Sequence, residues 1–294
     1  MFVLAHLSDP HLAPLPKIRP FELASKRGLG FLNWLRRRRS VHRAEVLATL
    51  VADLKARAPD HVAVVGDLVN LSLSTEFAPA RTWLEKLGGP ADVTLVPGNH
   101  DAYVRAAADL AQRHWGEFMA GDDGGGGFPF VRRRGPLALI GLSTALPTLP
   151  LAATGRLHSD QLARLDPLLS ELEREGLCRV LLIHHPPIAG VNHFRRLVDA
   201  APLRELLRRR GAELVLHGHL HRDSLVWLPG PHSRIPVIGV PSASGAPGRG
   251  DDPAGYNLYE IDGAPGAWRC TMAVRGLHDD GPGIDELRRQ PLFG

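Results

Sequence analysis

The stretch ELVLHGHLHRD, residues 213–223, shows how this chain is organised. The apolar run ELVL ends abruptly, and His217, His219 and His221 follow at alternate positions. A short apolar run closed by glycine is typical of a strand buried on both faces. The stretch therefore predicts a buried strand that delivers metal-competent imidazoles at its carboxyl end.

Four other apolar runs end in the same way, at residues 2–8, 61–66, 93–98 and 179–183. Helical patterns lie between runs, at residues 41–57, 159–175 and 201–210, and Pro167 is expected to kink or split the second. This alternation predicts an α/β protein in which the strand ends gather polar groups at one edge. The groups that follow the four runs are Asp9-Pro10-His11, Asp67, Asn99-His100-Asp101 and His184-His185.

The composition narrows the class of protein. The 294 residues are 44% hydrophobic and 22% charged with a net charge of +4, which suits a globular protein and is too mild to require nucleic acid. Cys178 and Cys270 are the only cysteines, so a disulfide framework and a cysteine-rich zinc site are excluded. The N-terminus lacks the features of a signal peptide, and no apolar run approaches the ~18 residues of a membrane span. We expect a soluble, cytoplasmic protein.

Five strand ends that each close in a metal-competent oxygen or nitrogen predict a metal site. A lone Asp or His after a strand is usually a turn residue, but five together are harder to explain in that way. Two neighbouring metal ions need about this many ligands and one group that bridges them. A carboxylate can bridge through its two oxygens, whereas imidazoles and an amide oxygen add no charge.

In these residues the sequence resembles the calcineurin-like metallophosphoesterases, over roughly residues 1–245. That family's pattern is D-x-H, G-D, G-N-H-D/E, H and G-H-x-H. It appears here, in order, as Asp9-Pro10-His11, Gly66-Asp67, Gly98-Asn99-His100-Asp101, His184 and Gly218-His219-Leu220-His221.

The resemblance implies a fold and a set of ligands. The fold would be a four-layer αββα sandwich of two mixed sheets, formed by a single domain over residues 1–294. His217 matches no ligand position, so we expect it to be structural. The ligands would be Asp9, His11 and His221 for one divalent ion, Asn99, His184 and His219 for the other, and Asp67 for both.

The chemistry of such a site assigns further residues. Two divalent ions clamp the phosphoryl oxygens and turn a water into the attacking hydroxide. His100 lies beside Asn99 and outside the ligand pattern, so it is the candidate general acid. Some relatives carry Asp three residues after the bridging Asp. This chain has Asn70 there, which brings no charge to raise the pKa of His100, and Asp101 is the catalytic residue expected to compensate.

The substrate contacts and the metals stay open at this point. His185 and Asn70 are candidate substrate-binding residues, and the alternative for His185 is to shape the turn before Pro186-Pro187. A mixed nitrogen and oxygen site accepts Mn, Fe, Zn or Co, and availability decides among them.

A basic insertion at about 12–40 interrupts the strand–helix alternation. Residues 17–43 combine arginines with an apolar, Trp-bearing face, and Gly28 and Gly30 argue against one continuous helix. One interpretation is a lid that contacts an anionic membrane surface or a lipid substrate. The other is an arginine-coated helix packed on the protein. From about 225 the chain is β-rich, which predicts a second sheet packed on the first.

Several functions are compatible with these motifs. The motifs are most similar to the bacterial class III cyclic-nucleotide phosphodiesterase branch, which implies a small phosphodiester substrate. A pyrophosphatase acting on a nucleotide–lipid such as UDP-diacylglucosamine, peripheral at the inner face of the membrane, is the alternative favoured by the insertion. A nuclease is disfavoured because few aromatics lie among the clustered arginines. A non-catalytic scaffold is disfavoured because no ligand is missing.

Overall fold

Two six-stranded mixed sheets pack face to face in the computed structural model, which describes residues 1–107, 109–278 and 283–294. In the first sheet the neighbouring strands β1, β2 and β3 are parallel, and β10, β11 and β12 follow on the other side of β1, each antiparallel to its neighbour. Its order is β12 (Ile284–Phe293), β11 (Ala267–Leu277), β10 (Gly255–Ala264), β1 (Phe2–Leu7), β2 (His61–Val65) and β3 (Val93–Val96).

The second sheet has parallel strands β5, β6, β7 and β9 between two antiparallel edge strands. Both sheets show short, almost completely buried central strands, as expected for strands covered on both faces. Its order is β4 (Phe130–Arg134), β5 (Leu137–Leu142), β6 (Cys178–Ile183), β7 (Leu214–His217), β9 (Arg234–Gly239) and β8 (Ser224–Pro229).

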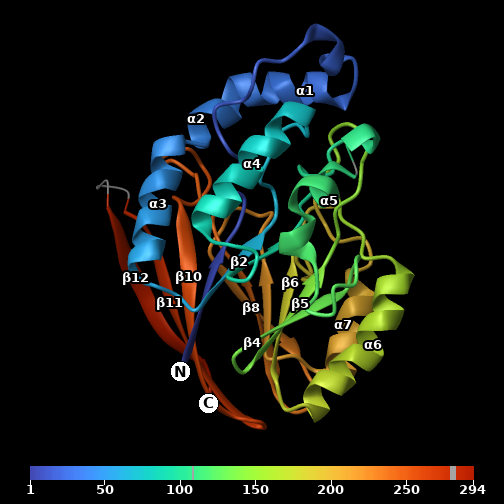
Figure 1. The fold of residues 1–294 in the computed structure, drawn as a ribbon, viewed down its shortest axis with the longest axis vertical. Coiled ribbons are helices and arrows are strands. Elements are labelled where there is room, and N and C mark those ends of the chain that lie inside the picture. Colours follow the sequence, from blue (N-terminus) through green and yellow to red (C-terminus); the bar gives the residue numbers. More distant parts are fainter. Residues whose placement is uncertain (108, 279–282) are drawn as a thin grey trace.

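Helices cover the outer faces of both sheets (Figure 1). On the first sheet lie α3 (Ala44–Ala56) and α4 (Ser74–Leu87), and α5 (Leu110–Trp115) packs on α4 between the short 3₁₀ turns Arg105–Ala107 and Gly116–Met119. On the second lie α6 (Ser159–Arg174) and α7 (Ala200–Arg210). The predicted αββα arrangement of two mixed sheets and helices is confirmed. No helix in the described residues is long and apolar enough to cross a membrane.

Two local predictions about the fold are wrong. The strands after residue 225 do not form a sheet of their own, because β8 and β9 join the second sheet and β10 to β12 join the first. Helix α6 runs unbroken through Pro167, because its side chains Leu165, Leu169 and Leu172 pack in the core and hold the helix in place. Strand β12 was not expected, since its largely exposed, charged sequence at the sheet edge lacks an apolar pattern.

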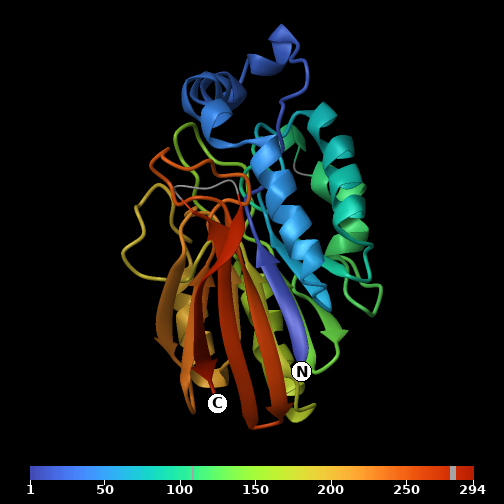
Figure 2. The same ribbon diagram turned by 90° about the vertical axis from the view of Figure 1, so that its left-hand side faces the viewer.

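The basic insertion forms a roof across the carboxyl ends of the strands (Figures 1 and 2). After a short 3₁₀ turn, Pro20–Leu23, the helix runs continuously through α1 (Lys26–Asn33), a π-helical turn η2 (Trp34–Arg38) and α2 (Arg39–Val41). The expectation that its glycines would break the helix is therefore wrong. A Cβ on Gly30 would lie 2.5 Å from the Tyr103 hydroxyl oxygen, so glycine is what lets the helix approach the loop after β3.

Both ends of the roof are fixed to the body of the protein. At the N-terminal end Arg27 donates to the backbone oxygens of Leu71 and Ser72. At the C-terminal end His42 Nδ1 lies 3.0 Å from Ser244 Oγ, and the Val41 carbonyl accepts from the backbone of Ala246. The insertion is thus held in a fixed position on the body of the protein.

Candidate metal centre

The five loops that carry the predicted ligands meet at one edge, where the carboxyl ends of both sheets come together. Three loops follow the parallel strands β1, β2 and β3, and two follow β6 and β7. All seven predicted ligands are buried, with exposed fractions between 0% and 7%. They are Asp9, His11, Asp67, Asn99, His184, His219 and His221.

The backbone of these loops is strained at the predicted ligands. Five of the seven have a left-handed φ, between 38° and 68°, which L-residues other than Asn and Asp rarely adopt. Such strain persists where the surrounding structure enforces it, often at functional sites. The loops are also tightly packed, and Gly98 of the motif is required there because a Cβ at this position would overlap the Asp67 carboxylate. The five residues are Asp9, His11, Asp67, His219 and His221.

The first donor group consists of Asp9, His11 and His221, whose ligating atoms all lie within 4.8 Å of one another. His11 Nδ1 points at the Val69 carbonyl at 3.3 Å, which leaves the Nε2 lone pair free. That Nε2 lies 3.4 Å from His221 Nε2 and 3.8 Å from Asp9 Oδ1. Two imidazole nitrogens and a carboxylate facing one point match the donor set of a divalent cation.

The second donor group contains two buried atoms without a hydrogen-bond partner in the described structure and a third side chain with a free ring nitrogen. His184 Nδ1 donates to the Val65 carbonyl at 2.7 Å, and its buried Nε2 has no hydrogen bond within the described structure. Asn99 Oδ1 is also buried and unpaired among the described residues. His219 Nε2 pairs with the Arg195 carbonyl at 2.8 Å, which leaves Nδ1 as its free nitrogen. A buried unpaired acceptor costs about 1–3 kcal/mol, so these atoms fit a bound cation well.

Asp67 lies between the two groups. Its Oδ2 is 3.8 Å from His11 Nε2 and 3.4 Å from His184 Nε2, and its Oδ1 accepts the backbone N–H of His100 at 2.7 Å. One carboxylate therefore faces both donor groups, as a bridging ligand must.

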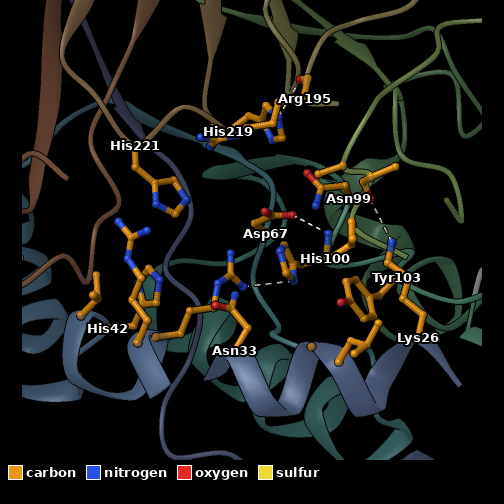
Figure 3. A pocket seen from close by; sticks show the side chains of 18 of the residues that line it. Lys26, Asn33, His42, Asp67, Asn99, His100, Tyr103, Arg195, His219 and His221 are labelled. Carbon is orange, nitrogen blue, oxygen red and sulfur yellow. Dashed lines mark hydrogen bonds between the residues drawn. The ribbon is translucent and has the colours of Figure 1, made fainter. Parts of the chain in front are cut away.

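A cavity of about 510 Å³ opens over these groups, beneath the roof (Figure 3). Most of the residues that form the cavity wall were not predicted from the sequence. The one available signal was that the insertion begins one residue after His11 and so had to start near the ligands. The missed residues that line it are Lys26, Asn33, Arg38, His42, Tyr103 and Asp251. Arg195, from the loop before α7, also lines it.

His100 faces the cavity as a neutral imidazole. Its Nδ1 donates to the backbone carbonyl of Asn70, and Arg38 Nη1 lies 3.2 Å from the same nitrogen. Burial and the Arg38 charge together lower the pKa of His100 to about 3. The lowering comes from burial and Arg38, whereas the hydrogen bond to the Asn70 backbone oxygen acts in the opposite direction, so the predicted effect of the Asn70 side chain stays a prediction. The role of His100 as general acid stays a prediction.

The structure places Asp101 and Asn70 outside the cavity. The fully buried Asp101 carboxylate accepts the backbone N–H groups of Asp67, Leu68, Val69 and Gly98 at 2.8–3.2 Å. Asn70 Nδ2 donates to the Leu12 carbonyl at 2.9 Å. This geometry favours a positioning role for Asp101, at the loops that carry Asp67 and Asn99, over its predicted catalytic role, which stays a prediction. Asn70 likewise has no access to a substrate in the cavity.

His185 lies behind His219, with the two ring centroids 4.3 Å apart. Its Nδ1 pairs with Thr144 Oγ1 at 2.7 Å and its Nε2 with the Ala153 carbonyl at 3.2 Å. The ring is fully buried, and burial lowers its pKa to about 3. Since both nitrogens are used within the protein, the geometry favours the turn-shaping interpretation over substrate contact.

His217 and His219 provide a test of the ligand assignment. His217 is buried in the core, with Nδ1 2.9 Å from the Gly218 carbonyl, whereas His219 lines the cavity. We expect His219→Ala to lower kcat/KM at least about a hundredfold and His217→Ala less than about tenfold, because only His219 belongs to a donor group. Steady-state kinetics on folded variants decides, and equal losses would overturn the assignment.

Two packed sheets with buried carboxylate, imidazole and amide donors at their joined edge define a metal-dependent hydrolase. Residues 2–223 match the family model described as calcineurin-like phosphoesterase, and the chain belongs to this family. It is accordingly a metal-dependent phosphohydrolase, and the described residues hold candidate metal-binding clusters.

Known proteins agree with this membership. The chain is 29% identical over 229 residues to a "Probable cyclic nucleotide phosphodiesterase" of Synechococcus sp., covering 76% of this chain and 80% of that protein. A dimetal phosphatase from Danio rerio has the same fold at 12% identity, with a TM-score of 0.58 over 99% of this chain and 98% of its own. A purple acid phosphatase of yellow lupin aligns with a TM-score of 0.62 at 12% identity, over 97% of this chain and 52% of its own.

Proposed function

We propose that the protein hydrolyses a phosphodiester with two divalent ions held by the two donor groups. The observation that carries this proposal is that Asp67 faces both groups, within 3.8 Å of His11 and 3.4 Å of His184. The similarity to a cyclic nucleotide phosphodiesterase supports a cyclic nucleotide or a similar small diester as substrate. In this proposal Asp9, His11 and His221 hold one ion, Asn99, His184 and His219 the other, and Asp67 both.

The bound ions would polarise the phosphoryl group and activate a water. The protein contributes the geometry: Asp101 fixes the loops of Asp67 and Gly98, so that the donors need no rearrangement when the reaction occurs. His100 donates Nδ1–H to the Asn70 carbonyl, so the neutral ring presents an unprotonated Nε2 to the cavity. To act as general acid it would first take up a proton at Nε2, which a bound anionic phosphoester beside it would favour.

A second candidate, a nucleotide–lipid pyrophosphatase, is favoured by apolar side chains at the cavity mouth. Leu29 of the roof is 50% exposed, and Leu151 of the facing loop is 87% exposed, yet both line the cavity. Leu149 and Phe194 are 80% and 59% exposed in the loops that continue this rim. Exposed apolar groups beside a site often mark a ligand surface, and an acyl chain would be covered there.

A substrate panel on metal-loaded protein tests the proposal. The protein is stripped with a chelator and reloaded separately with Mn, Fe, Zn or Co, and each form is given bis(p-nitrophenyl) phosphate, p-nitrophenyl phosphate, a cyclic nucleotide and UDP-diacylglucosamine. We expect no turnover after chelation and at least about tenfold preference for diesters over the monoester, a difference of about 1.4 kcal/mol in transition-state binding. Turnover that survives chelation, or a preference for the monoester, would contradict the proposal.

A further inference from the structure

Three cations face the cavity without a carboxylate partner. Lys26 Nζ donates to Thr148 Oγ1 at 2.6 Å and to the Ala152 carbonyl at 3.2 Å. Arg38 lies against His100, and Arg195 donates to the His219 carbonyl at 2.7 Å. Among the described residues none of the three forms a salt bridge, whereas the fourth lining cation, Arg37, lies 3.6 Å from Asp251.

Three cations of the roof helix, Lys26, Arg37 and Arg38, line the cavity, and Figure 3 labels Lys26 among them. In an α-helix, positions 26, 30, 33 and 37 lie along one stripe, and position 38 lies about a quarter turn away from it. The π-helical turn Trp34–Arg38 contains an extra residue per turn, and both Arg37 and Arg38 line the cavity. The local irregularity therefore adds a second arginine to the inner face.

Lys26 and Arg38 reach the same part of the cavity from different points of the roof. Arg38 Nη1 lies 3.2 Å from His100 Nδ1, beside the donor groups, whereas Lys26 is held on the Thr148 and Ala152 wall, over the Tyr103 ring at 4.2 Å. The Tyr103 ring in turn stacks on the His100 ring, with 5.1 Å between the two centroids. Lys26 and Arg38 are both half-buried, and burial lowers the pKa of Lys26 to about 8. A half-buried cation without a counterion is unfavourable unless a ligand supplies the charge.

We infer that Lys26 and Arg38 of the roof, with Arg195 on the facing wall, form an anion-binding subsite that selects substrates with a second anionic group beside the scissile phosphoester. The inference rests on the proposed phosphodiesterase function and names its substrate class. A diphosphate diester supplies that second charge, whereas a cyclic mononucleotide carries only one. The roof insertion is then a specificity element of the active site.

The experiment compares two unhydrolysable probes, methylphosphonate and methylenediphosphonate, by isothermal titration calorimetry of Mn-loaded protein with excess Mn²⁺. We expect the diphosphonate to bind at least about tenfold more tightly in the wild type. Lys26→Met and Arg38→Met should each reduce this preference about three- to tenfold, and Lys26→Arg should retain most of it. Arg36→Met and Arg39→Met are matched controls, because both arginines are exposed on the same roof and neither lines the cavity.

Two outcomes would overturn the inference. One is equal binding of the two probes by the wild type. The other is an equal loss in the control variants, which would indicate a diffuse electrostatic effect. Circular dichroism melting confirms that each variant is folded, and the Lys26→Arg result is informative even if Lys26→Met is not stable. Hydrolysis of bis(p-nitrophenyl) phosphate is measured in parallel, so that failure of the proposed function is seen separately from failure of the subsite.

Discussion

Asp67→Asn is expected to lower kcat/KM for a phosphodiester at least about a thousandfold and to reduce the bound metal from two ions to one or fewer. The reason is that Asp67 faces both donor groups through a single oxygen, Oδ2, which lies 3.4 Å from His184 Nε2 and 3.8 Å from His11 Nε2. The amide keeps the size of the side chain, and its oxygen can still accept the backbone N–H of His100. It then presents an uncharged NH₂ group, in place of the negatively charged Oδ2, to both donor groups.

The measurements are metal content by mass spectrometry after Mn loading and gel filtration, together with steady-state kinetics. Asp262→Asn is the control, because Asp262 pairs with Arg269 at 3.3 Å on the surface, does not line the cavity and belongs to neither donor group. We expect this control to keep both ions and to lose less than about tenfold in kcat/KM. An Asp67→Asn protein that retained two ions and normal turnover would refute the bridging assignment.

The candidate ligands could be predicted from the sequence because each of them closes an apolar run. The end of a buried parallel strand fixes the position of the next residues, so that Asp67 after β2 had to lie near Asn99 after β3, and His184 after β6 near His219 after β7. The same runs predicted an α/β protein, whereas the αββα layering was implied by the resemblance to the metallophosphoesterase family. The sequence signal was therefore strongest where chain direction alone determines position.

The roof could not be predicted because its structure depends on tertiary contacts. Helix propensity alone disfavours Gly28 and Gly30, but Gly30 is the residue that allows contact with Tyr103. Arg38 reaches His100 only because a π-helical turn changes the register, and His42 reaches Ser244 from the other end. A periodicity of 3.6 residues predicts neither contact.

Asp101 was expected to be catalytic because it lies next to His100 in the sequence and could compensate for the uncharged Asn70. Adjacency in sequence, however, does not tell where a side chain points. In the tight turn after β3, His100 faces the cavity and Asp101 faces the backbone of the loop after β2. His100 and Asp101 are neighbours in the motif, but their side chains face different parts of the protein. A substitution of Asp101 can test whether this residue acts on the substrate or on the loops.

Asp101→Ala is expected to destabilise the metal-free protein by about 3–5 kcal/mol, which is roughly 10 °C in Tm. The substitution leaves four backbone N–H groups without an acceptor, from Asp67, Leu68, Val69 and Gly98, in a region with no access to solvent. Asp101→Asn should destabilise the protein less than Asp101→Ala, because its amide oxygen still accepts some of these N–H groups. Some loss remains, because its NH₂ group then faces other N–H donors. Urea and thermal denaturation after chelation measure this loss without the contribution of bound metal.

Asp109→Ala is the matched control, because Asp109 is exposed next to α5 and its side chain makes no capping hydrogen bond there. We expect it to change the unfolding free energy by less than about 0.5 kcal/mol. If Asp101→Ala left stability unchanged and lowered kcat alone, Asp101 would act on the substrate, as its place beside His100 first indicated. A large loss of stability accompanied by weaker metal binding would instead establish that this carboxylate holds the loops of Asp67 and Asn99 in the geometry that the ions require.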